Sequence, residues 1–248
     1  GQEPRIAQTP NPTPNTQVIV AEPSNCNLVV ESGHHSEIGK RKTMEDFFVI
    51  FDDLRETFPN LYFGHKWSLY AVFDGHGGPE TAKLCHEVLP TNIVSRPSFG
   101  LFDFYRAFSE GFERTDSAIL QESRNRNFKD GSTAVVCLIH NDILYVANVG
   151  DSEAVIGRVG ADGYYEAAVM TEIHRANEEK EKQRIEAEGG AVFSGRVFGS
   201  LAVSRAFGDS DFKKPSQEAN FVISEPFMNK TTLTDSDHFL IMGCDGVW

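Results

Sequence analysis

Apolar residues in this chain gather into short runs that end at polar or glycine-rich loops, a pattern typical of buried strands. The clearest run is Trp67–Phe73 (WSLYAVF), in which all residues but one are apolar or aromatic. A run this short and this rich in Trp, Tyr, Val and Phe predicts a strand buried on both faces. The run ends at Asp74, and Pro79 then begins a stretch with apolar residues at helical spacing, which predicts a helix. Asp74 and His76 therefore lie in a glycine-rich loop, where the backbone can approach a ligand closely.

Further strands and helices follow from the same pattern. Helices are predicted to begin at Pro79 and to span 101–124 and 178–188, the last ending at a Gly-Gly pair typical of helix C-termini. Strands are predicted at 27–30, 47–51, 132–140, 143–149, 154–159, 164–170, 221–224 and 238–244. The segment 196–209 is predicted to be a loop with a short helix. Many strands in two clusters, with two or three helices, indicate an α+β fold of antiparallel sheets with helices packed on them.

Composition divides the chain into a lead-in and one folded domain. Residues 1–24 carry five of the eleven prolines and few large apolar side chains, so they are predicted to be disordered or extended. Residues 25–248 are long enough for one sizeable domain with a proper core. The hydrophobic content of the whole chain, 40%, is ordinary for a globular protein.

Charge and cysteine usage narrow the classes of function. The net charge of −13 argues against binding to nucleic acid or to an anionic membrane, and it disfavours an anionic substrate unless local cations reverse the field. No apolar run approaches the ~20 residues that a membrane span needs, and no signal peptide is visible. The four cysteines show no CxxC pairing, which favours free thiols in a reducing compartment. We therefore expect an intracellular protein, cytoplasmic or nuclear.

Carboxylates stand next to several of the predicted strands. Asp74, Asp151 and Asp245 each follow an apolar strand, and Glu45 and Asp46 directly precede another. In antiparallel sheets the start of one strand lies beside the end of its neighbour, so these acids can gather at one edge. Such a cluster suits Mg²⁺ or Mn²⁺ better than zinc. Each acid taken alone is most simply a turn residue, but four such sites against buried strands favour a metal site.

Seven motifs occur in an order that resembles one known family. They are RKTMED (41–46), VFDGHGG (72–78), DGSTAVV (130–136), VANVGDSEAV, RIEAEGG, RVFGSLAVSRAFGD and MGCDGVW. They resemble the metal-dependent Ser/Thr protein phosphatases of type 2C, and the resemblance extends over roughly residues 27–248. The resemblance implies a four-layer α/β/β/α sandwich of two antiparallel sheets flanked by helices. It also implies a monomeric enzyme that hydrolyses phosphoserine and phosphothreonine on phosphorylated protein substrates.

The resemblance also implies which residues bind metal. Glu45, Asp74 and the carbonyl of Gly75 would hold one Mg²⁺ or Mn²⁺ ion. Asp74 would bridge to a second ion, which Asp245 would also bind. Asp151 and Asp245 would share a weaker third site.

Three further residues receive catalytic roles from the same resemblance. Asp46 would hydrogen-bond metal-bound water, Arg41 would bind the substrate phosphate, and His76 would be the general acid for the leaving alkoxide. Two divalent ions can hold a bridging hydroxide at neutral pH and aim it at phosphorus. The planar guanidinium of Arg41 matches phosphate geometry. The positive charge of the two ions and of Arg41 would also let an anionic substrate approach a chain whose net charge is −13.

The chain departs from the family pattern at three places. The text at 171–177 (TEIHRAN) replaces the usual Asp-His-Lys-Pro and keeps His174, and Phe198 stands where Asn is frequent. The sequence stops at Trp248, before the helices and the last Asp ligand that the family has. We therefore expect a domain that lacks its C-terminal part, that binds the second metal weakly and that is impaired in activity.

Two other classes of protein compete with this interpretation. A non-catalytic, phosphatase-like binding module should have lost metal-binding acids or the phosphate-binding arginine, yet every one of these residues is present in the sequence. A calcium-binding adhesion module would explain acids at strand ends. It would not explain Arg41 or His76.

Overall fold

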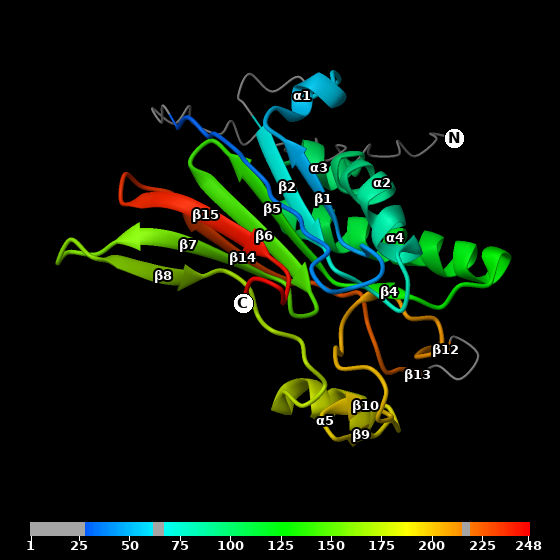
Figure 1. Cartoon of the computed structure of the whole chain (residues 1–248). Coiled ribbons are helices and arrows are strands. Elements are labelled where there is room, and N and C mark those ends of the chain that lie inside the picture. The colour runs from blue at the N-terminus through cyan, green and yellow to red at the C-terminus, as the bar shows by residue number, and fades with distance from the viewer. Residues whose placement is uncertain (1–27, 62–66, 215–218) are drawn as a thin grey trace, which may run out of the picture.

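A five-stranded antiparallel sheet forms the centre of the computed structural model, which describes residues 28–61, 67–214 and 219–248 (Figure 1). The predicted lead-in, 1–24, lies outside the described residues. The order across this sheet is β1-β2-β5-β6-β14, and its strands are β1 (Phe47–Phe51), β2 (Trp67–Phe73), β5 (Ala134–His140), β6 (Ile143–Val149) and β14 (Phe227–Thr232). Every residue of the central strand β5 is buried. Its apolar sequence fits a strand that is covered on both faces.

Helices cover one face of this sheet. They are α2 (Glu80–Val94), α3 (Pro97–Gly100) and α4 (Phe104–Arg126), while the short α1 (Leu54–Thr57) follows β1. The buried stripe of α4 includes Phe104, Phe108 and Phe112, as its 3.6-residue spacing predicts. Gly111 lets α4 approach α2 closely, because a Cβ there would lie 2.6 Å from Cγ1 of Ile93. No helix in the described ranges is long and apolar enough to cross a lipid bilayer.

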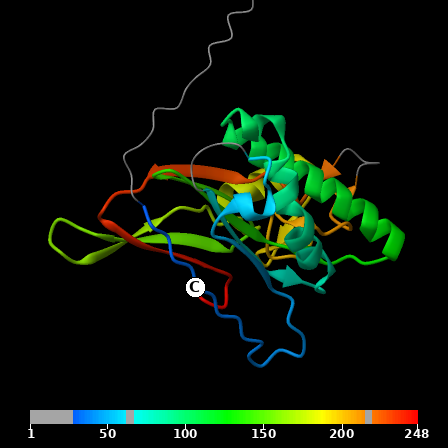
Figure 2. The same ribbon diagram turned by 90° about the horizontal axis from the view of Figure 1, so that it is seen from above.

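A second antiparallel sheet packs against the other face of the first, as Figures 1 and 2 show. Its order is β15-β7-β8, and its strands are β7 (Glu153–Val159), β8 (Tyr165–Val169) and β15 (Asp237–Gly243). The core between the two sheets contains Cys137, Leu144 and Ile156. The predicted α+β class, with antiparallel sheets flanked by helices, is confirmed.

The outer face of the three-stranded sheet is apolar and exposed. Tyr165, Val169, Phe239 and Ile241 are exposed there, and in the part of the chain that the structure describes no helix covers them (Figure 2). Three layers of the implied four-layer sandwich are therefore seen in the described residues.

A small unit with its own core lies beside the sheets, at the bottom of Figure 1. It contains α5 (Glu179–Ala187) and the hairpin of β9 (Val192–Phe193) and β10 (Arg196–Val197). Ile185 and Val197 are fully buried in its core. Buried Glu181 joins α5 to the following segment, since its carboxylate pairs with Arg184 at 3.0 Å and with Arg205 at 2.7 Å.

Short strands complete the structure. They are β3 (Gly75–His76), β4 (Gly131–Ser132), β11 (Phe207–Gly208), β12 (Lys213–Lys214) and β13 (Ala219–Asn220). β3, β4 and β11 form a three-stranded sheet in the order β11-β4-β3. This small sheet begins where β2 ends, and it places His76.

Four sequence predictions of local structure were wrong. Residues 28–30 form no strand, and 196–209 contains β10 and β11 rather than a helix. In place of the strand predicted at 221–224, the structure has β13 just before it and one isolated bridge at Ile223. The strand predicted at 132–140 is interrupted at Thr133, which separates β4 from β5. β14 was missed because its sequence, FMNKTT, is half-exposed and weakly apolar.

Candidate functional site

The end of β2 delivers Asp74 to a junction of three segments. The backbone N–H of Asp74 donates to Oγ1 of Thr133 at 3.3 Å, and the N–H of Thr133 donates to the Asp74 carbonyl at 3.0 Å. Gly75 follows, and a Cβ there would collide with the carbonyl oxygen of Glu45. Glycine is therefore needed where the loop after β2 passes the segment that leads into β1.

Asp46 and Asp74, which we call the carboxylate pair, come together with Cys244 in a group that could hold a metal ion. One ligand atom from each lies within 4.8 Å of the other two, and the Cys244 thiol donates to Oδ2 of Asp46 at 3.6 Å. Burial, and then the charges of Asp46, Asp245 and Asp151, raise the pKa of Asp74 to about 7. Burial also raises the pKa of Asp46. Like charges held close together in this way are stabilised by a cation.

The donor set fits a hard divalent ion. Carboxylate oxygens suit Mg²⁺ and Mn²⁺. Burial raises the pKa of Cys244 to about 11, so its sulfur stays a neutral thiol, which is a poor ligand for such ions. The sequence did not single out Cys244 for this place, although its position beside Asp245 at the end of β15 was a usable signal.

The side chains of the other predicted metal ligands lie outside this group. Asp151 and Asp245 add negative charge that acts on Asp74, but neither belongs to the group around Cys244. The Asp151 carboxylate instead accepts a hydrogen bond from Nε of Arg175 at 3.1 Å. Glu45 adds charge beside Asp46, and its carboxylate accepts from Oγ1 of Thr43 at 3.0 Å.

Arg41, the predicted phosphate-binding residue, lies in the exposed loop that precedes β1. Its backbone N–H donates to the Ile38 carbonyl at 3.2 Å. Among the residues described, the guanidinium has no ion pair closer than 4.0 Å. The structure therefore leaves this side chain free to meet an anion from solution.

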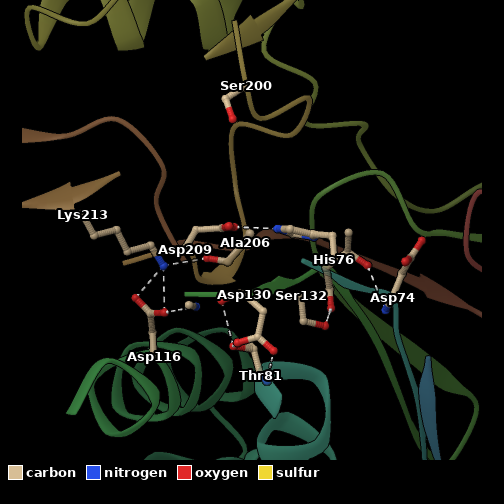
Figure 3. Close-up of polar contacts among 12 residues, drawn as sticks. Asp74, His76, Thr81, Asp116, Asp130, Ser132, Ser200, Ala206, Asp209 and Lys213 are labelled. Atoms are coloured by element: carbon tan, nitrogen blue, oxygen red, sulfur yellow. Dashed lines mark hydrogen bonds and ion pairs between the residues drawn. The ribbon is translucent and has the colours of Figure 1, made fainter. Parts of the chain in front are cut away.

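His76 lies between Asp74 and a second group of acids (Figure 3). Its Nε2 is 2.8 Å from Oδ2 of Asp209, whose side chain is 5% exposed. Burial alone would lower the pKa of His76, but the hydrogen bond to Asp209 and the charges of Asp209, Asp74 and Asp130 outweigh it and raise the pKa. Sequence reasoning missed Asp209, although it ends the motif RVFGSLAVSRAFGD.

The carboxylates behind Asp209 are all hydrogen-bonded. Oδ2 of Asp130 caps the start of α2, where it accepts from the N–H of Glu80 at 2.7 Å and of Thr81 at 3.2 Å. The Asp116 carboxylate accepts from Nζ of Lys213 at 2.7 and 2.8 Å, and both side chains are buried. Lys213 also donates to the Ala206 carbonyl at 2.8 Å (Figure 3).

His174 lies in the loop between β8 and α5. The residue is 1% exposed, and within the described ranges neither ring nitrogen has a hydrogen-bond partner. Burial, followed by the charges of Arg205 and Arg184 and opposed by Glu181, lowers the pKa of His174 to about 4. The ring is therefore neutral at physiological pH.

A cavity of about 800 Å³ lies between the β1–β2 side of the larger sheet and β15. Its lining includes Asp46 and Cys244, together with residues 28–37, but not Asp74, His76 or Arg41. The cavity therefore borders the carboxylate pair without containing the residues predicted to act on phosphate.

A sequence model of the family described as Protein phosphatase 2C matches residues 30–248 of this chain. The chain belongs to the protein phosphatase 2C family. Solved structures agree in fold. A C. elegans sex determining protein matches with a TM-score of 0.67 and 28% identity, over 84% of this chain and 50% of that one. Serine-threonine phosphatase 2C from Toxoplasma gondii matches with a TM-score of 0.73 and 21% identity, over 85% and 76%.

Several curated proteins are similar in sequence to this protein phosphatase 2C chain. Protein spalten of Dictyostelium discoideum is 38% identical over 89% of the chain and 23% of its own length. Probable protein phosphatase 2C 22 of Arabidopsis thaliana is 38% identical over 88% of the chain and 56% of its own length. Probable protein phosphatase 2C member 13, mitochondrial, of Oryza sativa subsp. japonica has the same three values. The chain thus spans 23% of the first relative and about half of the other two.

Proposed function

We propose that the protein hydrolyses phosphoserine and phosphothreonine esters on phosphorylated protein substrates, with Mg²⁺ or Mn²⁺ bound at the carboxylate pair. The observation that carries the proposal is the close approach of Asp46 and Asp74 in a half-buried place, where burial and then the neighbouring carboxylates raise the pKa of Asp74 to about 7. A site of this kind favours a divalent cation, and His76 lies directly beside it. Membership of the protein phosphatase 2C family supports a metal-dependent protein phosphatase.

The oxygen donors around the carboxylate pair fit two ions. Asp74 would bridge them, with Glu45 and the Gly75 carbonyl on one ion and Asp245 on the other. Asp151, now paired with Arg175, would share a weaker third site with Asp245. When bound, such ions polarise the phosphoryl group and generate a nucleophile from water at neutral pH.

The remaining residues bind the substrate and move a proton. Arg41 is exposed and free to grip two phosphate oxygens with its planar guanidinium. Its charge, together with that of the metal ions, reverses the field of a chain whose net charge is −13, so that a dianionic ester can approach. Asp46 would orient water at the metal site. His76 would protonate the oxygen of the departing serine or threonine.

The test is hydrolysis of a phosphoserine peptide by the full-length protein as a function of Mn²⁺ concentration. We expect metal-dependent turnover, and we expect Asp74→Asn to lower kcat by about 10³-fold because it removes the bridging charge. Asp211→Asn, a change at an exposed ion pair with Lys129, is the matched control and should keep the wild-type rate.

Two results would count against the proposal. Wild-type rates in Asp74→Asn would show that the carboxylate pair is not the metal site. Tight binding of the phosphopeptide without turnover would instead indicate a non-catalytic binding module. The monomeric state and the cytoplasmic or nuclear location stay predictions from the sequence.

A further inference from the structure

We infer that Asp209 is a positioning residue for His76, fixing the orientation and the tautomer of its ring. With Nε2 committed to Asp209, Nδ1 is the ring nitrogen that delivers the proton to the leaving group. This inference rests on the proposed phosphatase function and adds a residue that the function alone does not require. The hydrogen bond itself, at 2.8 Å, is drawn in Figure 3.

The register of the small sheet brings the two side chains together. His76 on β3 pairs with Gly131 on β4, and Gly131 pairs in turn with Gly208 on β11. Asp209 is the residue after Gly208, so His76 and Asp209 meet across β4. A Cβ on Gly131 would collide with both Oδ2 of Asp209 and Nε2 of His76. Glycine at this position therefore leaves the room that the hydrogen bond occupies.

The backbone at Asp209 is held in an uncommon conformation. Asp209 has φ +51° and Gly208 has φ +72°, and the left-handed region is sparsely populated by residues other than glycine. The N–H of Gly208 donates to Oδ1 of Asp116 at 2.9 Å, and the N–H of Asp209 donates to the Asp130 carbonyl at 3.0 Å. Buried Lys213 in turn fixes Asp116. Such a conformation persists where the surroundings over-determine it, and it often marks a functional site.

The carboxylate of Asp209 contacts the ring of His76. Among the described residues its side chain contacts a hydrogen-bonding partner only at His76, and it is almost fully buried. Nδ1 of His76 has no hydrogen-bond partner in the same ranges. A carboxylate on one ring nitrogen fixes which nitrogen carries the exchangeable proton, because the other is held as a donor to the carboxylate.

His76 gives its Nδ1 proton to the leaving group as the ester bond breaks. The bond between phosphorus and the seryl oxygen breaks, and that oxygen keeps the electron pair and takes the proton from Nδ1. The ring is left neutral with its remaining proton on Nε2, still donated to Asp209. A proton released by the attacking water, through solvent, then restores Nδ1.

The experiment compares two variants and two substrates in the full-length protein with saturating Mn²⁺. Asp209→Asn keeps a side chain that tolerates positive φ and an acceptor oxygen but loses the charge. Asp209→Ala removes the acceptor as well. One substrate is a phosphoserine peptide, whose leaving alkoxide needs a proton. The other is nitrophenyl phosphate, whose leaving group needs none at neutral pH.

If Asp209 positions His76, its replacement should lower kcat far more for the phosphopeptide than for nitrophenyl phosphate. With the phosphopeptide, kcat should fall by about 100-fold in Asp209→Ala and by about 10-fold in Asp209→Asn. With nitrophenyl phosphate, it should fall by less than about threefold. His76→Gln should show the same split, and adding Asp209→Ala to it should cause no further loss, because the two residues act as a unit. Asp211→Asn, two residues away and exposed, should leave both rates unchanged.

A merely structural role for Asp209 would give a different result. An equal loss on both substrates, or an unchanged phosphopeptide rate in Asp209→Ala, overturns the inference while wild-type turnover leaves the proposed function standing. No turnover by the wild type overturns the proposed function and, with it, the catalytic role of Asp209.

A nitrogen-15 NMR spectrum of the imidazole tests the positioning independently of turnover. We expect a single tautomer, with a slowly exchanging proton on Nε2 in the wild type and in Asp211→Asn. In Asp209→Ala that proton should exchange rapidly. A wild-type ring that populates both tautomers overturns the inference.

Discussion

On one side of His76 lie Asp46 and Asp74, whose carboxylates face each other and further acids. On the other side lie Asp209 and Asp116, each of which contacts a basic side chain, His76 or Lys213. The first two have raised pKa values because of burial and like charges. The second two are satisfied within the chain.

The difference separates two uses of a buried acid. A carboxylate with a cationic partner inside the fold contributes to geometry, and removing the partner leaves a charge that is costly to bury. A carboxylate beside others of its kind costs stability until a cation from solution joins it. The following four changes are designed to break or sharpen this contrast.

Lys213→Met should have the largest effect, because it leaves the buried Asp116 without its counter-ion. We expect the free energy of unfolding to fall by about 3–5 kcal/mol, measured by urea titration. The double variant Lys213→Met/Asp116→Leu should recover most of the loss. Lys129→Met breaks an exposed ion pair with Asp211 and should cost less than about 0.5 kcal/mol. Equal losses in the two single variants would remove the distinction between buried and surface pairs.

The imidazole of His174 is buried without a hydrogen bond in the described part of the chain, and it should make stability depend on pH. Its pKa is about 4 in the folded protein against an ordinary 6.5, so between these values the unfolded chain binds more protons than the folded one. Stability should therefore be fully present above pH 6.5 and be lost on acidification towards pH 4. At about 1.4 kcal/mol per pKa unit, the loss is on the order of 3–4 kcal/mol.

Denaturant titrations across this pH range test the role of His174. His174→Gln should flatten the dependence, whereas His35→Gln, at an exposed position, should not. An identical slope in His174→Gln and the wild type would contradict the prediction.

Asp74→Asn should stabilise the metal-free protein. The pKa of Asp74 is about 7 in the fold against an ordinary 3.8, so the folded state binds more protons between these values and loses stability as pH rises. In EDTA at pH 8 we expect the variant to be more stable by about 1–2 kcal/mol, with the difference vanishing near pH 4. Saturating Mn²⁺ should reverse the order. A variant that is less stable than the wild type in EDTA at every pH would refute the crowding argument.

Arg175→Ala should have the smallest effect, because its ion pair with Asp151 is partly exposed. Freed from this partner, Asp151 should bind a divalent ion more readily. In calorimetric titrations with Mn²⁺ we expect the weakest site to tighten about two- to threefold, the equivalent of a surface ion pair. Arg158→Ala, which breaks the pair with Asp237, should leave Mn²⁺ binding unchanged. A weaker site in Arg175→Ala would place Arg175 among the supports of the site instead.

Sequence patterns predicted the parts of this molecule that are locally encoded. The β2–loop–α2 unit follows from one apolar run, a glycine-rich loop and a proline. Of the acids next to strands, Asp46 lies close to Asp74, and the charges of Asp151 and Asp245 act on it. The strand predicted at 27–30 is not seen in residues 28–30, because an apolar run forms a strand only where another strand pairs with it. Asp209 and the pairing of Asp116 with Lys213 escaped prediction because tertiary contacts between distant segments create them. The burial of His174 escaped prediction for the same reason, because nothing in its local sequence reveals tertiary packing.

Gly131 shows that a position without a side chain can be as sensitive to mutation as one with a reactive group. The residue has no side chain that could bind a ligand or transfer a proton, yet any larger side chain would occupy the space in which His76 and Asp209 meet. In a saturation library selected for activity, Gly131 should tolerate almost no replacement. The positions that tolerate no replacement would therefore show where the site needs free space, in addition to where it needs a reactive group.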